Sequence, residues 1–117
     1  MNDFRQLKVW QKGKRLAVLV YGATAAYPRS ERFGLVHQTR RAAVSISANI
    51  AEGCGRRSNR DMARFVDIAL GSAYELASHV ELAADLGFMT TSTRQELIDC
   101  TSEVRRMLVG LRKSLLK

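Results

Sequence analysis

The chain has few residues that interrupt or cross-link a fold: one proline and two cysteines among 117 residues. Cys54 and Cys100 are too few for a disulfide scaffold, so we expect a reduced thiol pair. With so few breakers, we expect long uninterrupted elements. His37 and His79 have no neighbours at zinc-ligand spacing, and we predict neither a metal nor another cofactor.

The chain also lacks a hydrophobic run that is long enough to cross a membrane. Residues 12–28 pass from charged to apolar like a secretory leader, but the uncharged run of residues 16–27 is too short for a bilayer. Because the helical pattern begins earlier, at Leu7, we interpret this segment as a bundle helix. We therefore expect a cytoplasmic protein with no membrane partner.

Acidic residues are the scarcer charge: eleven Asp and Glu oppose nineteen Lys and Arg, and the formal net charge is +8. The distribution is uneven, because residues 29–64 carry eight arginines and three acids, while residues 65–104 carry one arginine and seven acids. The excess permits binding to nucleic acid, an acidic membrane or an acidic protein. The acidic block indicates that part of the positive charge is neutralised within or between subunits.

Apolar residues recur at helical spacing in four segments. The expected helices cover residues 7–27, 31–53, 58–86 and 93–115. We expect Ser58 and Thr93 to cap the third and fourth helices, and Gly53 and Gly55 to end the second in a left-handed conformation. Short connections between long amphipathic helices favour antiparallel neighbours. The sequence therefore predicts a single all-α domain over residues 1–117, an up-down antiparallel four-helix bundle.

The segment "AVSISANI", residues 43–50, alternates apolar and polar residues like a half-buried strand. We interpret it as helix, because its alanines weaken strand propensity. The apolar pattern also reaches back to Leu35 without a turn signal.

The third expected helix carries more apolar surface than one face can bury. Ile68, Leu82 and Leu86 lie roughly 90–120° from its main apolar stripe. We expect a homo-oligomer that buries them. Scattered surface leucines, which are common, are the alternative.

Arg40 and Arg41 lie in the middle of the second expected helix. An antiparallel third helix would bring them near Asp67 and Glu75, and we expect ion pairs with these acids. We place both arginines with the oligomer interface.

Two sets of cations are candidate ligands for nucleic-acid phosphates. The first forms a stripe within about 80° of arc on the first expected helix: Arg5, Lys8, Lys12 and Arg15. A solvated helix face is the alternative for this stripe. The second set surrounds the start of the third helix: Arg56, Arg57, Arg60 and Arg64. Because a helix N-terminus disfavours cations, this cluster calls for an anion, either phosphate or a carboxylate such as Glu52 or one from a neighbouring subunit.

Catalytic motifs are missing as well. "GCGRRS" lacks the spacing of a phosphate-binding loop, no Ser/His/Asp order stands out, and we do not expect an enzyme. Trp10, Tyr21, Tyr27 and Tyr74 fall in helical stripes that look like packing positions. Base stacking is therefore not expected, and binding would have low sequence specificity.

Several segments carry a family resemblance: "FRQLKVWQKGKRL", "ERFGLVHQTRRAAVSISANIAEG", "GRRSNRDMARFVDIALGSAYEL" and "LAADLG". They resemble the bacterial four-helix-bundle family related to the 23S ribosomal RNA intervening-sequence-encoded proteins. The likeness runs from Phe4 to about Leu111. It implies an up-down bundle assembled into a ring, a pentamer.

The chain is similar, more distantly, to the accessory variability determinants of diversity-generating retroelements. These are basic pentameric bundles thought to bind nucleic acid and a reverse transcriptase. The resemblance supplies no binding residues, and Gly13 stands where the closer family often has alanine.

The sequence leaves two functions open. The first is a non-enzymatic basic homo-oligomer that binds nucleic acid, RNA before DNA, through arginine–phosphate contacts of low sequence specificity. The second is an oligomeric scaffold whose charges hold subunits together or dock a protein partner. Only the first predicts salt-dependent affinity for nucleic acid.

Overall fold

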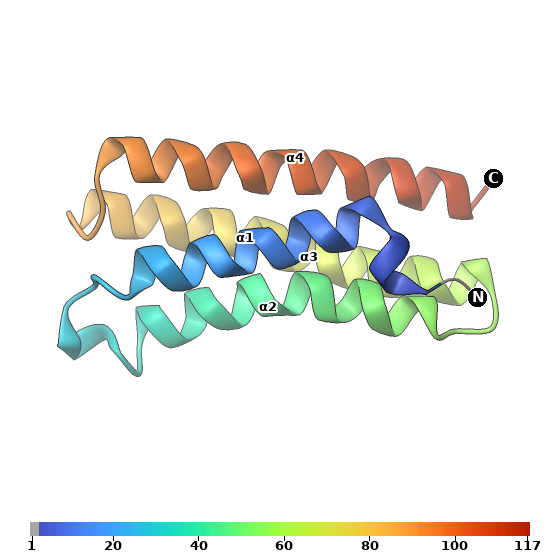
Figure 1. Ribbon diagram of the computed structural model, residues 1–117, viewed down its shortest axis with the longest axis horizontal. Coiled ribbons are helices and arrows are strands. Elements are labelled where there is room, and N and C mark those ends of the chain that lie inside the picture. Colours follow the sequence, from blue (N-terminus) through green and yellow to red (C-terminus); the bar gives the residue numbers. More distant parts are fainter. Residues whose placement is uncertain (1–2) are drawn as a thin grey trace.

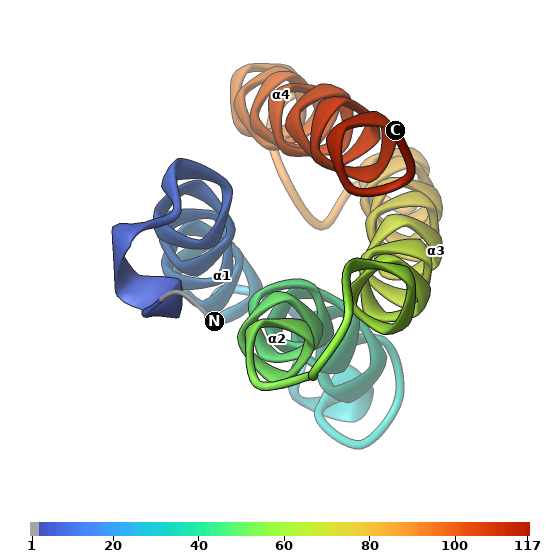
Figure 2. The same cartoon turned by 90° about the vertical axis from the view of Figure 1, so that its right-hand side faces the viewer.

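The computed structural model describes residues 3–117 and consists of four α-helices around one core (Figures 1 and 2). The helices are α1 (Lys8–Thr24), α2 (Leu35–Cys54), α3 (Asn59–Asp85) and α4 (Thr91–Leu115), with short 3-10 helices η1 (Phe4–Gln6) and η2 (Arg29–Glu31). Successive helices run antiparallel, and α1 packs against both α2 and α4. The prediction of an all-α up-down bundle is confirmed.

The apolar stripes of all four helices meet in a single main core. Its buried members are Val9, Leu16 and Val20 of α1, Ala42, Ala43, Ile46 and Ile50 of α2, Val66, Ala69, Ala73, Leu76 and Val80 of α3, and Leu97, Val104 and Leu108 of α4. Burial of one large aliphatic side chain contributes about 1.5–3 kcal/mol. The predicted stripes therefore supply the main stabilising term, although Phe65 of the expected third stripe is only partly buried.

Residues 43–50 are helical, which confirms the interpretation against a strand. Two of their three polar members lie on the α3 side of α2. Ser45 and Ser72 share a 2.8 Å hydrogen bond between hydroxyls, and the Asn49 amide donates to the Ser45 carbonyl at 2.8 Å. Ser47 lies instead beside Gly13 of α1. At Ser45 and Asn49 the alternation in sequence thus reflects a polar seam between two helices.

Gly53 lets α2 approach α3 closely. A Cβ on Gly53 would lie only 3.1 Å from Cβ of Phe65, across the α2–α3 contact, so a larger side chain there requires its neighbours to shift. A Cβ added to Gly13 would lie 3.4 Å from Cγ2 of Ile46, which is an ordinary van der Waals contact. The α1–α2 contact therefore has room for an alanine at position 13.

Gly53 and Gly55 do not end α2 in the way that we expected. Neither has a positive φ, and Gly53 lies buried inside the last turn of the helix. Within residues 3–117, the positive φ falls at Gly87 (80°), where the Phe88 N–H donates to the Ala83 carbonyl at 2.9 Å. This left-handed cap ends α3.

Of the two N-cap residues predicted from the sequence, one is confirmed and one is wrong. Ser58 caps α3 as predicted and accepts the Asp61 N–H at 3.1 Å. The cap of α4 is Thr90, which accepts the Thr93 N–H at 3.1 Å, so the prediction of Thr93 as the cap was wrong by one turn.

The turn between α1 and α2 is longer than expected. The helix α1 stops at Thr24, and α2 begins at Leu35 instead of near residue 31. The 3-10 helix η2 occupies part of this turn, and the Glu31 carboxylate accepts the Leu35 N–H at 3.3 Å. The N-terminus of α2 is thus satisfied by a preceding side chain.

Candidate nucleic-acid interface

The antiparallel order brings three cationic segments to one end of the bundle. The start of α1, the α2–α3 turn and the end of α4 all lie on the right of Figure 1. This half carries Arg5, Lys8, Lys12, Lys14, Arg15, Arg56, Arg57, Arg60, Arg64, Arg105, Arg106, Arg112, Lys113 and Lys117. Against these fourteen cations stand five acids (Asp3, Glu52, Asp61, Asp67 and Glu103), which leaves a side-chain charge of +9. We call this half of the molecule the basic end.

Every acid of the basic end is already paired. The pairs are Arg5–Asp3 at 3.0 Å, Arg56–Glu52 at 3.1 Å, Arg64–Asp61 at 3.3 Å, Lys12–Glu103 at 2.6 Å and Arg112–Asp67 at 2.6 Å. Four of the eight predicted phosphate ligands are therefore engaged in exposed ion pairs. Such pairs are worth about 0–1 kcal/mol and can yield to a polyanion.

The sequence left a phosphate or a carboxylate open as the anion for the arginines of the α2–α3 turn; the structure contains carboxylate pairs, and phosphate binding stays a prediction. The Arg56 guanidinium pairs with Glu52 and lies over the Phe65 ring, 4.5 Å from its centroid. Arg57 and Arg60, by contrast, are exposed and form no hydrogen bond or ion pair within residues 3–117. These two arginines have their guanidinium groups free for an external anion.

The four cations of the predicted stripe on the first helix also divide into two that are paired with a carboxylate and two that are not. Lys12 reaches across to α4, and its hydrogen bond holds the pKa of Glu103 below the ordinary value. Arg5 folds back onto Asp3. Lys8 and Arg15 remain exposed and have no carboxylate within ion-pair distance in the described chain.

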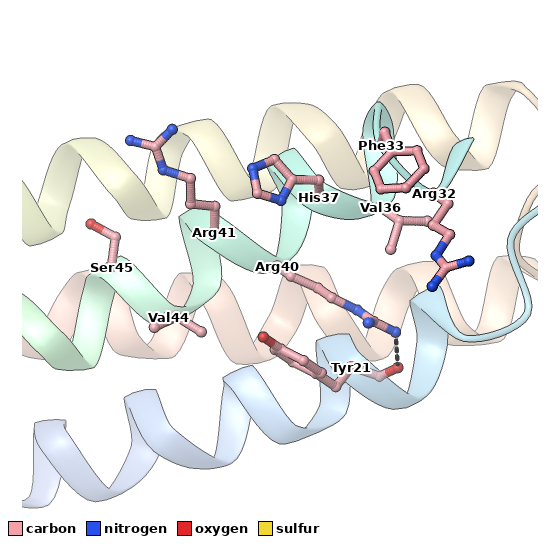
Figure 3. A pocket seen from close by; sticks show the side chains of 9 residues that line it. All are labelled: Tyr21, Arg32, Phe33, Val36, His37, Arg40, Arg41, Val44 and Ser45. Carbon is pink, nitrogen blue, oxygen red and sulfur yellow. Dashed lines mark hydrogen bonds between the residues drawn. The ribbon is translucent and has the colours of Figure 1, made fainter. Parts of the chain in front are cut away.

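A groove of about 570 Å³ lies over the first half of α2, bordered by Tyr21 of α1 and by residues 32–33 of the preceding turn (Figure 3). Its lining consists of Tyr21, Arg32, Phe33, Val36, His37, Arg40, Arg41, Val44 and Ser45. The lining combines three arginines with apolar side chains and contains no acid. Phe33 is 87% exposed at the mouth of the groove. We call this feature the α1–α2 groove.

Arg40 lies in this groove and does not reach α3. Its Nε donates to Thr24 Oγ1 at 2.8 Å, and its guanidinium lies 4.4 Å from the centroid of the Tyr21 ring (Figure 3 shows Arg40 beside Tyr21). The predicted ion pair with an acid of α3 was wrong, because Arg40 projects from the side of α2 that faces α1.

The acids expected to pair with Arg40 and Arg41 have other partners. Asp67 binds Arg112 of α4, and Glu75 binds the His79 ring at 3.1 Å. Arg41 and Glu75 line the same hollow between α2 and α3, but they form no ion pair. The Arg41 guanidinium has no hydrogen-bond partner within residues 3–117.

The aromatic side chains divide into two kinds. Tyr27 is buried and Trp10 partly buried, as the packing interpretation predicts. Tyr21 and Tyr74 are exposed, and each has an arginine guanidinium over its ring. The packing interpretation was therefore wrong for these two tyrosines, which lie at the surface.

The surplus apolar surface expected on the third helix is present. Ile68, Leu82 and Leu86 are each at least half exposed on α3. Their burial by another copy stays a prediction.

Both cysteines are free thiols whose pKa is raised, in each case mainly by burial. Because the thiolate is the reactive form, a raised pKa leaves less of it between pH 7 and 9 than in the unfolded chain. We expect a chromogenic disulfide reagent at pH 8 to label the native protein at least about tenfold more slowly than the protein in urea. Labelling at equal rates in both states would contradict this burial.

Neither a membrane span nor a cluster of metal-ligand side chains is found among the described residues. No helix among residues 3–117 combines the length and the apolar character needed to cross a bilayer. No three His, Cys, Asp or Glu side chains in the same range converge as metal ligands would.

Together, the fold and the charge arrangement define a basic four-helix bundle. Residues 5–110 match the family described as 23S rRNA-intervening sequence protein, and the chain belongs to this family. It is similar to a crystal structure of a protein with unknown function from the S23 ribosomal protein family of Bacteroides thetaiotaomicron VPI-5482. The TM-score is 0.81 at 25% identity, over 90% of this chain and 98% of the other. No curated protein matches.

Proposed function

We propose that the protein is a non-enzymatic homo-oligomer that binds nucleic acid through phosphate contacts at the basic end. The observation that carries this proposal is the charge of +9 on one half of a bundle whose cross-section is about 23 × 20 Å. A duplex segment about 23 Å long carries roughly a dozen phosphate charges. The side-chain charge of +9 at the basic end can therefore neutralise a large part of the phosphate charge, though not all of it.

The contacts proposed are of the kind that tolerates many sequences. The cations project from helix surfaces and from a short turn, and phosphate contacts carry no base information. RNA is the first ligand to test, because a structural relative comes from a family described as ribosomal. DNA remains the comparison in the same assay.

The proposed oligomer is supported by the exposed apolar side chains of α3, which a single copy leaves in water. The number five comes from the resemblance to pentameric rings. Light scattering measures it directly: a pentamer of this 13.1 kDa chain has a mass near 65 kDa.

A scaffold function is the second candidate, and the α1–α2 groove favours it. Phe33 and Val44 are exposed there. Apolar side chains of this kind suit a protein surface better than a phosphate. A scaffold would bind protein with little dependence on salt, and it would not retain RNA.

The double variant Arg57→Gln, Arg60→Gln tests the nucleic-acid proposal with little risk to the fold, because neither side chain has a partner in the described chain. We expect RNA affinity at 0.1 M salt to fall roughly tenfold or more, and the slope of log K against log salt to flatten by about 1.5. Filter binding or fluorescence anisotropy across a salt series measures both quantities.

Arg29→Glu is the matched control, since it removes the same net charge at the opposite end of the bundle. It should change RNA affinity by less than about threefold. Equal losses in the control and in the double variant would show that only total charge matters and would overturn the assignment to the basic end.

A further inference from the structure

The start of α1 and the end of α4 lie side by side, because the up-down order brings the last helix back beside the first (Figures 1 and 2). Helical spacing places five cations of the basic end along the outer side of this contact: Lys8, Lys12 and Arg15 of α1, and Arg106 and Lys113 of α4. Glu103 of α4 is the acid among them. We call these six residues the α1–α4 surface, and five cations against one acid give it a side-chain charge of +4.

Only one of these cations has an ion-pair partner within residues 3–117. Lys12 Nζ donates to Glu103 Oε1 at 2.6 Å, across from α1 to α4. Lys8 and Arg15 lie about one turn to either side of Lys12. Arg106 lies about one turn beyond Glu103, and all five cations are exposed. The surface therefore combines four cations that lack a carboxylate partner with one ion pair at its centre.

We propose that one strand of a nucleic-acid backbone lies along the α1–α4 surface, and that the Glu103 carboxylate holds a position that a phosphate takes when the ligand binds. Glu103 then competes with the ligand from within the chain and limits its affinity. This inference rests on the proposed function and deepens it, because it assigns a path for the phosphates and an internal regulator of the same basic end.

The surroundings of Glu103 are those that suit a phosphate oxygen. The hydrogen bond from Lys12 holds the pKa of Glu103 below its ordinary value, and the charges of Arg106 and Arg15 lower it further. A carboxylate and a phosphate offer anionic oxygens to the same donors. The side chains of Lys12 and Glu103 are 46% and 44% exposed, so a polyanion can reach the pair and displace the carboxylate.

The spacing of the cations suits a single strand. From Lys8 to Arg15, α1 rises about 10 Å. Over that length one strand of a duplex presents about three phosphates, which equals the number of cations that α1 contributes. On α4, Gly110 lies between Arg106 and Lys113, and a Cβ added to it would meet open space. The missing side chain leaves room for a backbone to approach α4 between two cations.

Glu103→Gln removes the competing charge and keeps the shape of the side chain. Lys12 then has no carboxylate partner in the described chain. We expect RNA affinity at 0.1 M salt to rise about three- to eightfold, and the slope of log K against log salt to steepen by about 1. Fluorescence anisotropy with a short labelled RNA duplex of mixed sequence, across a salt series, measures both quantities.

Glu96→Gln is the matched control, since it makes the same substitution on the same helix, seven positions earlier. Glu96 is exposed and has no ion pair within residues 3–117. It lies about 10 Å from Glu103 along the helix, one Debye length at 0.1 M salt, so affinity should change by less than about twofold. Equal gains in the two variants would mean that net charge alone sets the affinity, and the assignment to the α1–α4 surface would be wrong.

Arg106→Gln is the second variant, and it breaks no ion pair of the described chain. RNA affinity should fall about three- to eightfold, with wild-type helix content by circular dichroism. A Glu103→Gln variant that loses helix content and RNA affinity together would assign Glu103 to helix packing and refute the competition. If wild-type protein binds RNA and neither Glu103→Gln nor Arg106→Gln changes the affinity, only this inference fails. Wild-type protein that binds no RNA at about 50 mM salt would refute the proposed function itself.

Discussion

Leu76→Ala is expected to lower the free energy of unfolding by about 3 kcal/mol. Leu76 is fully buried in α3 and belongs to the core cluster that all four helices share. Truncation removes apolar burial and leaves a cavity, because the surrounding helices are held by their own packing and relax only partly. A domain of this size has a total stability of about 5–15 kcal/mol, so one substitution removes a large share. Urea unfolding followed by circular dichroism measures the change.

Leu82→Ala is the matched control on the same helix, since half of the Leu82 side chain is exposed. In a dilute monomer it should cost less than about 1 kcal/mol. If Ile68, Leu82 and Leu86 of α3 lie in a subunit interface, the destabilisation caused by Leu82→Ala should grow with protein concentration. The reason is that the wild-type oligomer becomes more stable as the concentration rises, and the substitution weakens the oligomer. Equal losses for the two leucines at low concentration would contradict the placement of the core.

The fold was predictable because helical periodicity is a local property of the sequence. Tertiary packing then buries the apolar stripes that the periodicity defines. The stripe through Leu35, Thr39, Ala42, Ile46 and Ile50 is buried as its spacing predicts. Helix ends were less predictable. In "TTSTRQEL" several hydroxyls could cap the fourth helix, and only the backbone conformation at Thr90 selects one.

Glycine roles also depended on tertiary structure. A glycine at the end of a helix can adopt the left-handed conformation of a cap, or it can allow a neighbouring helix to approach closely. The sequence is the same in both cases. Gly53 serves close approach, since its nearest foreign atoms are the side chains of Met62 and Phe65. Gly87, one residue beyond the expected end of the third helix, takes the left-handed conformation.

The candidate site was only partly predictable. The arginines of the α2–α3 turn stood out by their position at a helix start, but their neighbours across the bundle did not. Arg112 and Lys113 lie in the last turn of α4, where the helix dipole favours cations, so they gave no functional signal in the sequence. The antiparallel order of α1 and α4 brings them to the same end as the turn. The hydrogen-bond partner of Arg40 could not be predicted for a similar reason. It depends on which neighbouring helix the side chain faces, and Arg40 turns toward α1 and not α3.

Reversing all four arginines of the α2–α3 turn to glutamate is expected to lower RNA affinity about a thousandfold at 0.1 M salt. The variant Arg56→Glu, Arg57→Glu, Arg60→Glu, Arg64→Glu takes the formal net charge from +8 to 0. Loss of four phosphate contacts should also flatten the salt dependence by about 3. The fold should persist. Two ion pairs become repulsive at about 0.3–0.5 kcal/mol each, while acids near the start of α3 gain a similar amount from the helix dipole.

The charge-conserving variant, with lysine at the same four positions, separates charge from structure. Lysine keeps the electrostatic attraction and gives up the bidentate fork of arginine, so it should retain most of the affinity. Mass measurements on both variants locate the cluster. Weakened RNA binding by an intact oligomer assigns the arginines to the ligand, whereas a monomer would assign them to the subunit contact. RNA binding that survives the reversal, or a wild-type protein that binds none at 50 mM salt, would leave the scaffold as the function that the geometry supports.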